Sequence, residues 1–235
     1  MNSPALAPAA QQFIQSVLDK KPQLAVFDCD GTLWQADSGE QFMNWEIERG
    51  LLPPEIARAL TARYELYRRG EVGEDDMCGE MVTIHEGISY ASLMEAARNF
   101  IPEVITPGVF PEMQVLTNKL RECGCDLWAI SSTNDWVVRE GVKPYSIPGD
   151  HVIAACVDTS TGIAGGKIVR MPSGEGKAIA IREVIQRIPD AVFGNSKWDV
   201  AMLELARHAY AINPNPDLEA LAEQRGWTIY KPAGN

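Results

Sequence analysis

The sequence predicts an α/β fold: a Rossmann-like parallel sheet with helices on both faces and a block of helices inserted after the first strand. One observation is that short apolar segments alternate with helical segments from residue 108 onward, which is typical of parallel strands joined by crossover helices. The other is the segment 37–107, whose pattern indicates helices with no convincing strand between them. We therefore expect a core domain of residues 1–36 and 108–235 and a helical cap domain of residues 37–107.

The first strand is expected at residues 24–27, a continuous apolar run that indicates burial on both faces of the sheet. Asp28 and Asp30 follow it directly, and Gly31 lets the backbone turn after them. Ligands of open α/β sheets bind beyond the carboxyl ends of the strands, and two carboxylates this close favour a divalent cation between them. The sequence therefore predicts a metal-assisted site at this edge of the sheet.

The remaining elements are expected in chain order from periodicity and from their bounding Gly, Pro and Ser residues. In the cap, helices are expected at 40–49, 53–70, 75–85 and 89–100. In the core, we expect a helix at 111–123, a strand at 126–131, a hairpin of 152–157 with 167–170, a helix at 177–187, and strands at 191–193 and 209–212.

Composition narrows the class of protein. An apolar content of 46% and a charged content of 23% are ordinary for a globular chain, and 235 residues bury a substantial core. No stretch approaches the ~18 consecutive apolar residues of a membrane span. The net charge of −11 argues against nucleic acid as a partner, because proteins that bind its backbone present a basic surface.

The cysteines and the N-terminal segment predict a cytoplasmic location. Residues 1–12 are rich in Ala, Pro and Gln and lack the basic start and apolar run of a secretory leader. The five cysteines form no pair of Cys-x-x-Cys motifs, which favours free thiols in a reducing compartment. Monomer and homodimer both remain open.

Polar residues follow several of the predicted strands in a fixed order. They are the pair Asp28 and Asp30, then Ser131, then Lys177, then Asn195 with Asp199. In this order they resemble the four motifs of the haloacid dehalogenase superfamily of phosphohydrolases, and the resemblance covers almost the whole chain after residue 24. The helical insertion and the hairpin between the second and third motifs are similar to those of the phosphoserine-phosphatase branch.

The resemblance implies Mg²⁺-dependent hydrolysis of a small phosphomonoester. Asp28 would be the nucleophile that forms an aspartyl-phosphate, and Asp30 would protonate the leaving oxygen and later deprotonate the attacking water. The phosphate-binding side chains would be Thr32, Ser131, Ser132 and Lys177. The metal site would comprise Asp28, the Asp30 carbonyl and Asn195, with Asp199 in the second coordination sphere. The second acid argues against dehalogenation, whereas a phosphomutase is compatible with these motifs.

Two positions depart from the pattern of the family. Asn195 stands where many relatives have Asp, which removes one negative charge from the Mg²⁺ site. Because an amide oxygen still binds Mg²⁺, we predict weaker metal binding and not its loss. Met81 stands where the phosphoserine enzymes place the arginine that binds the substrate carboxylate, which argues against phosphoserine as the substrate.

An alternative substrate is an ester with a cationic leaving group such as choline or ethanolamine. Residues 37–107 contain fourteen acids, six arginines and no lysine, so their net charge is −8. Acids and aromatic rings together attract a cation. The candidate specificity residues are Trp34, Asp37, Glu40, Trp136 and Trp198. In the competing interpretation, the acids form a solvated helical face and the tryptophans pack in the core.

An alternative hypothesis from a different functional class is a phosphate-ester-binding protein whose turnover was lost with the acid at position 195. The enzyme is favoured because Asp28, Asp30, Lys177 and Asp199 are all present.

Overall fold

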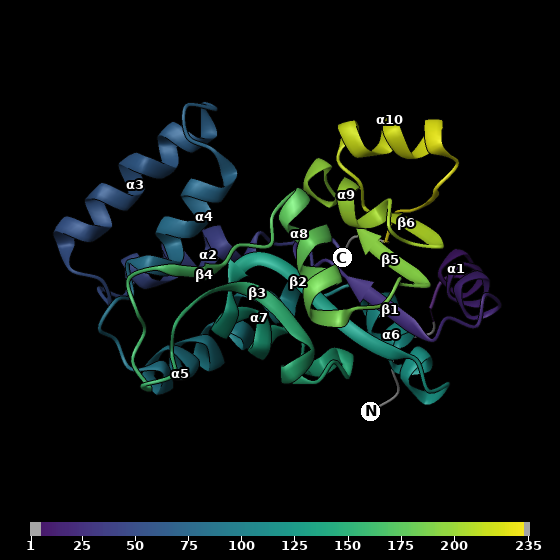
Figure 1. Cartoon of the computed structure of the whole chain (residues 1–235), viewed down its shortest axis with the longest axis horizontal. Helices are drawn as coiled ribbons and strands as arrows, with labels where there is room; N and C mark the ends of the chain where they lie inside the picture. The colour runs from purple at the N-terminus through teal and green to yellow at the C-terminus, as the bar shows by residue number, and fades with distance from the viewer. Residues whose placement is uncertain (1–5, 233–235) are drawn as a thin grey trace.

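The computed structural model describes residues 6–232 and contains a seven-stranded sheet (Figure 1). The strands are β1 (Leu24–Phe27), β2 (Asp126–Asn134), β3 (Val152–Val157), β4 (Ile168–Arg170), β5 (Ala191–Gly194), β6 (His208–Ile212) and β7 (Thr228–Tyr230). Their order is β4-β3-β2-β1-β5-β6-β7, and neighbours are parallel except β3 with β4. The predicted α/β fold is confirmed.

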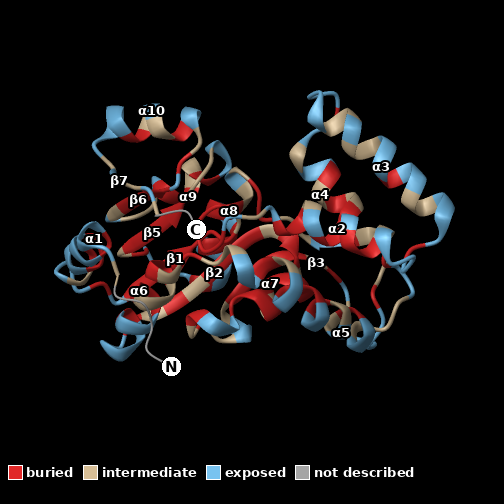
Figure 2. Cartoon of the chain, turned by 180° about the vertical axis from the view of Figure 1, so that it is seen from behind, coloured by how far each residue is buried: buried red, intermediate tan, exposed pale blue. Residues whose placement is uncertain are grey.

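Helices cover both faces of the sheet. One face is covered by α1 (Pro8–Leu18), α6 (Pro111–Glu122) and α7 (Asp135–Gly141), and the other by α8 (Glu175–Ala180), the π-helix η5 (Ile181–Ile185), α9 (Val200–Leu203) and α10 (Pro216–Arg225). Along β1, Ala25 and Phe27 belong to the first hydrophobic cluster and Leu24 and Val26 to the second. The strand is therefore buried on both faces, as the apolar run predicts (Figure 2).

The inserted segment forms four helices that stand to one side of the sheet in Figure 1. They are α2 (Ser38–Glu48), α3 (Pro54–Arg68), α4 (Glu74–Thr83) and α5 (Tyr90–Phe100), and α5 runs on through η1 (Ile101–Ile105) and η2 (Thr106–Gly108). The remaining short helices are η3 (Lys143–Tyr145), η4 (Gly149–His151) and η6 (Lys197–Asp199). The four helices predicted for the cap are thus present, each within a few residues of its predicted bounds.

The inserted helices do not have a wholly separate core. Phe42 of α2, Val82 of α4 and Phe100 of α5 belong to the same hydrophobic cluster as the sheet residues Phe27 and Phe193. A smaller cluster joins α2, α3 and α4 through Met43, Leu52, Leu60, Val72, Met77 and Met81. The division into a core and a cap domain stays a prediction, since α2 and α5 pack as part of the main core.

The structure differs from the sequence prediction in several elements. Strand β2 continues to Asn134 rather than residue 131, and the helix expected at 177–187 is a short α-helix followed by a π-helix. Helices α1 and α10 and strand β7 were not expected. Residues 1–5 lie outside the described residues. They belong to the segment 1–12, which the sequence predicts is not a secretory leader. Within residues 6–232, no helix combines the length and apolar character that a membrane crossing needs.

Candidate active site

A cavity of about 290 Å³ lies where β1, β2 and β5 end, at the carboxyl edge of the sheet. Residues that follow these strands line one side of it, and residues of α3 and α4 line the other. Eight of the residues predicted from the sequence line this cavity: Asp28, Asp30, Asp37, Ser131, Ser132, Lys177, Asn195 and Trp198. The inserted helices therefore cover the acids that follow the first strand.

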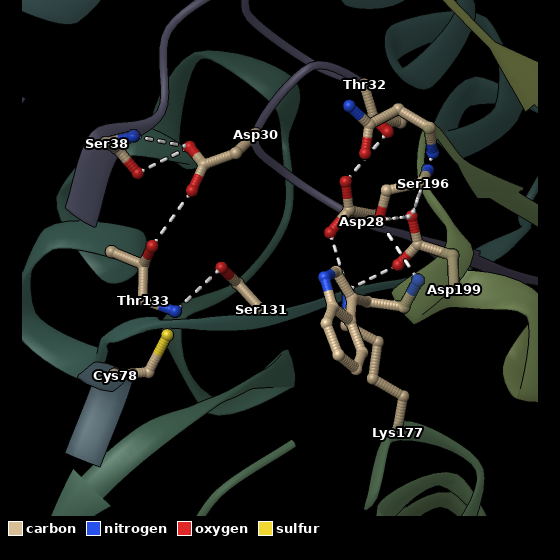
Figure 3. Close-up of polar contacts among 12 residues, drawn as sticks. Asp28, Asp30, Thr32, Ser38, Cys78, Ser131, Thr133, Lys177, Ser196 and Asp199 are labelled. Carbon is tan, nitrogen blue, oxygen red and sulfur yellow. Dashed lines mark hydrogen bonds and ion pairs between the residues drawn. The ribbon is translucent and has the colours of Figure 1, made fainter. Parts of the chain in front are cut away.

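Asp28 is a buried carboxylate held at both oxygens (Figure 3). Its Oδ1 accepts a hydrogen bond from Lys177 Nζ at 2.7 Å, and its Oδ2 accepts one from Thr32 Oγ1 at 2.8 Å. Burial and then the charge of Asp199 raise the pKa of Asp28 to about 7, against the opposing effect of Lys177. The result is a fixed, poorly solvated carboxylate at the wall of the cavity, which suits a nucleophile.

Lys177 of α8 is shared between two carboxylates. Its Nζ also donates to Asp199 Oδ1 at 2.6 Å, and both residues are buried. Burial alone would lower the pKa of Lys177, but the charges of Asp199 and Asp28 raise it above its ordinary value. Lys177 is therefore an ammonium group at neutral pH, as stabilisation of a phosphoryl group requires.

Asp199 accepts hydrogen bonds both from Lys177 and from the backbone of the loop after β5. Its Oδ2 accepts hydrogen bonds from the backbone nitrogens of Asn195 and Ser196, both at 2.9 Å. Gly194 permits this approach, because a Cβ there would lie 2.6 Å from Asp199 Cβ. Asp199 is fully buried, which suits the predicted role of orienting Lys177 rather than direct metal ligation.

Asp30 is surrounded by hydrogen-bond donors. Its Oδ1 accepts from Trp34 Nε1 at 2.6 Å, from Ser38 N at 2.9 Å and from Ser38 Oγ at 2.6 Å. Its Oδ2 accepts from Thr133 Oγ1 at 2.9 Å (Figure 3). Three segments of the chain, namely the loop after β1, the start of α2 and the end of β2, thus converge on one carboxyl group.

The residues at this edge fit a hard divalent cation. The carboxylates of Asp28 and Asp199 share the buried ammonium group of Lys177, and the charge of Asp30 also acts on Asp28, so the site has an excess of negative charge. Asn195 brings an amide oxygen to the same cavity, and its side chain packs on Gly31, where a Cβ would lie 1.9 Å from Asn195 Nδ2. Oxygen ligands of this kind suit Mg²⁺. No group of three or more His, Cys, Asp or Glu within residues 6–232 has the geometry of a metal centre, so an amide and a carbonyl would have to complete the set.

The predicted phosphate-binding hydroxyls have different surroundings. Ser131 is nearly buried at the cavity wall, and its Oγ accepts from Thr133 N at 3.1 Å, which leaves the hydroxyl proton for a ligand. Ser132 also lines the cavity, and its hydroxyl opposes the burial that raises the pKa of the Cys78 thiol in α4. The prediction that Thr32 contacts phosphate is corrected: its side chain is fully buried and its hydroxyl donates to Asp28.

Two of the tryptophans proposed for specificity are corrected by the structure. Trp34 and Trp136 are fully buried members of the main hydrophobic cluster and do not line the cavity. The indole of Trp34 instead donates a hydrogen bond to Asp30. The third, Trp198, does line the cavity and is 36% exposed. Although Trp34 and Trp136 lie near the motifs in the sequence, their large aromatic rings are buried in the core instead of facing the cavity.

The acids proposed for specificity lie beside residues of α3 and α4 that the sequence did not single out for binding. Asp37 lines the cavity, and burial and then the charge of Asp30 raise its pKa to about 7. Glu40 lies outside the lining but acts on Tyr64, whose pKa is raised by burial and then by the carboxylates of Asp37 and Glu40. Tyr64, Tyr67 and Glu74 also line this wall, and Tyr67 donates a hydrogen bond to Glu74. The tyrosines had a sequence signal, because both fall on one face of a predicted helix.

Ser38 and Thr133 are the other functional candidates that sequence reasoning missed. Thr133 lies two residues beyond Ser131, in the part of β2 that extends past the predicted strand. Ser38 begins α2, where Asp37 caps the helix by accepting from Glu40 N at 2.9 Å. The Asp-Ser pair at the start of a predicted helix was a usable signal for a helix N-terminus.

Comparisons with known proteins find hydrolases and phosphatases similar to this chain. A family model described as haloacid dehalogenase-like hydrolase matches residues 25–204. A curated relative named histidinol-phosphatase, from Neisseria meningitidis, is 28% identical over 217 residues, which span 88% of this chain and 97% of the relative. A phosphoserine phosphatase of Mycobacterium tuberculosis is 27% identical over 226 residues, 90% of this chain and 73% of the relative.

Solved structures support the fold. A protein of unknown function from Bordetella pertussis superposes with a TM-score of 0.78 at 24% identity and covers 88% of this chain and 96% of its own. A probable phosphoserine phosphatase from Vibrio cholerae superposes with a TM-score of 0.66 at 16% identity and covers 99% of this chain and 71% of its own. At these identities the likeness concerns the arrangement of sheet and helices alone.

Proposed function

Because this chain belongs to the haloacid dehalogenase-like hydrolase family, we propose that it is a Mg²⁺-dependent phosphatase that hydrolyses a small phosphomonoester through Asp28. The observation that carries the proposal is the Asp28 carboxylate at the cavity wall, held by Lys177 and Thr32. The cytoplasm as its location, and a monomer or homodimer as its state, remain predictions from the sequence.

The proposed reaction has two displacements at phosphorus. In the first, a carboxylate oxygen of Asp28 forms a bond to phosphorus while the bond to the ester oxygen breaks, and Asp30 gives that oxygen a proton. In the second, Asp30 takes a proton from water, the water oxygen bonds to phosphorus, and Asp28 is released with inorganic phosphate. Lys177 and Ser131 line the cavity beside Asp28 and would bind the negative phosphoryl oxygens in both steps. Mg²⁺, held by the Asp28 carboxylate, the Asp30 backbone carbonyl and the Asn195 side chain, would supply charge neutralisation for the phosphoryl group.

The cavity wall opposite Asp28 favours a cationic leaving group. Among the described residues that line the cavity, Lys177 is the single Lys, Arg or His, and it is already shared between two carboxylates. The far wall carries Asp37, Glu74 and the rings of Tyr64 and Tyr67. A carboxylate on the leaving group, as in phosphoserine, would face these acids without a basic partner. An ammonium group would be attracted by both the acids and the rings.

Histidinol phosphate, phosphoethanolamine and phosphocholine all meet this requirement, because each carries a cation and no carboxylate. The name of the Neisseria meningitidis relative makes histidinol phosphate the first of these to test. The name of the Mycobacterium tuberculosis relative implies phosphoserine as that protein's substrate. In this chain, Met81 at the cavity offers no positive charge to the carboxylate of phosphoserine. We therefore propose an amino-alcohol phosphate as the substrate class.

The test is phosphate release from these four esters and from p-nitrophenyl phosphate, with and without Mg²⁺, by the wild type and by Asp28→Asn. We expect Mg²⁺-dependent turnover that Asp28→Asn abolishes, with kcat/KM for the carboxylate-free amines above that for phosphoserine. Undiminished turnover by Asp28→Asn would overturn the proposed nucleophile. Binding of these esters without any turnover at high Mg²⁺ would instead favour a phosphate-ester-binding protein, the interpretation that Asn195 in place of an acid suggests.

A further inference from the structure

The two oxygens of Asp30 have unequal surroundings. Oδ1 accepts from three donors and Oδ2 from one. A carboxylate oxygen has about two lone-pair sites for hydrogen bonds, so Oδ1 is saturated. A proton on Oδ1 would have to expel a donor, whereas Oδ2 keeps room for one.

The donors also differ in whether they can accept a hydrogen bond as well as donate one. An indole N–H and a backbone N–H only donate, so Trp34 Nε1 and Ser38 N require Oδ1 to remain an acceptor. The Thr133 hydroxyl that bonds to Oδ2 can rotate and accept a hydrogen bond instead. The arrangement at Oδ2 therefore tolerates a proton there, and the arrangement at Oδ1 does not.

The fixed donors are held rigidly. The Trp34 ring is fully buried, and it lies so close to Gly141 that a Cβ at that glycine would be 3.0 Å from Trp34 Cη2. The ring also packs against Tyr145, with centroids 6.1 Å apart. Ser38 is the first residue of α2, and its N–H is one of the helix donors that find no partner within the helix.

We propose that Trp34, Ser38 and Thr133 are positioning residues that make Oδ2 of Asp30 the oxygen that gives a proton to the leaving group. The inference rests on the proposed phosphatase activity. In the first displacement the proton moves from Oδ2 to the ester oxygen as its bond to phosphorus breaks. In the second it returns to Oδ2 from the attacking water.

A purely structural role is the competing explanation, because donors around a buried carboxylate also stabilise the fold. The two roles differ in their dependence on the leaving group. An alkyl ester releases a strongly basic alkoxide that needs a proton, whereas p-nitrophenyl phosphate releases a weakly basic phenolate that does not. Loss of a positioning residue would therefore harm alkyl esters selectively, and loss of a structural contact would harm both esters alike.

The experiment compares kcat/KM for phosphoethanolamine, or the best alkyl ester of the panel, with kcat/KM for p-nitrophenyl phosphate at saturating Mg²⁺. For Trp34→Phe we expect a fall of about 10- to 100-fold with the alkyl ester and less than about 3-fold with p-nitrophenyl phosphate, since general acid catalysis contributes 10²–10⁴-fold. Thr133→Val should shift the ratio in the same direction, and it keeps the test decisive if Trp34→Phe does not fold.

Matched controls are available in the chain. Trp136→Phe removes the same volume from another fully buried tryptophan, whose Nε1 has no hydrogen-bond partner among the described residues. Thr117→Val alters a buried threonine of α6 whose hydroxyl bonds to Gln114 O. Both should leave the ratio of the two kcat/KM values unchanged.

Equal losses with both esters in Trp34→Phe and Thr133→Val, or no loss with the alkyl ester, would overturn the positioning role while leaving the phosphatase intact. A wild type that hydrolyses neither ester would instead overturn the proposed function, and the positioning role with it.

Discussion

At the scale of single residues, Asp28, Lys177 and Asp199 place two carboxylates around one ammonium group inside the protein. The pKa of Asp28 in the folded protein, about 7, lies above that of an unfolded chain. Between these two values the folded protein binds more protons than the unfolded one, so the free energy of unfolding decreases as pH rises through this range. Ionised Asp28, the proposed nucleophile, is therefore a source of instability in the folded protein.

We predict that Asp28→Asn abolishes turnover and raises Tm at pH 8 without Mg²⁺, because Lys177 then keeps one balanced partner, Asp199. The gain should be a few degrees, at about 2–4 °C for each kcal/mol, and smaller at pH 5, where Asp28 of the wild type is largely protonated. Thermal unfolding at both pH values measures it. A Tm that falls by the same amount at pH 5 and pH 8 would contradict this view of the charge balance.

At the scale of elements, the loop after β5 contributes Asn195 to the proposed metal site. We predict that Asn195→Asp lowers the Mg²⁺ concentration needed for half-maximal activity, because a carboxylate replaces a neutral amide. Asn213→Asp is the matched control, since it adds the same charge to another asparagine lining the cavity. A titration of activity with Mg²⁺ that is unchanged in Asn195→Asp, or changed equally in Asn213→Asp, would remove Asn195 from the metal site.

The position of Asp37 is likewise set by an element of the fold. Asp37 is the N-cap residue of α2, which places it across the cavity from the sheet. We predict that Asp37→Asn reduces kcat/KM for phosphoethanolamine about 10-fold and changes it little for p-nitrophenyl phosphate, as expected for one lost charge pair of ~1.4 kcal/mol. Asp75→Asn, an exposed residue of α4 outside the cavity lining, is the control. Equal effects of Asp37→Asn on both esters would exclude selection by charge.

How far the sequence predicted this site depends on how local each contact is. Asp28, Asp30 and Asn195 follow strands and Ser131 lies in the last part of β2, so a parallel sheet alone brings them together. The burial of Trp34 depends on the packing of distant segments, including Gly141, which no local pattern reveals. The docking of α3 and α4 over the cavity is likewise set by tertiary packing. For that reason, the sequence placed Tyr64 and Tyr67 on one helix face but not in the binding wall.

At the scale of the whole molecule, the main hydrophobic cluster runs from the sheet into α2 and α5. Phe100 is fully buried at this junction and packs edge-on against Phe42 with ring centroids 5.1 Å apart. We predict that Phe100→Ala lowers the free energy of unfolding by about 3–5 kcal/mol and that the chain still unfolds in one transition. Far-UV circular dichroism and tryptophan fluorescence, recorded on one sample, should change together. Two separated transitions would show that the inserted helices unfold independently of the sheet.

Chemical trapping of the acyl-phosphate tests most directly whether Asp28 is the nucleophile. The wild type, mixed with Mg²⁺ and its best ester and then quenched with borohydride, should carry homoserine in place of the aspartate at position 28, because borohydride reduces an acyl-phosphate to the alcohol. Peptide mass spectrometry locates the change, and an unreacted Asp28 in the protein treated without ester is the control. Homoserine at position 28 would establish the nucleophile. Homoserine at another aspartate, or turnover with no reducible intermediate, would contradict the proposed mechanism.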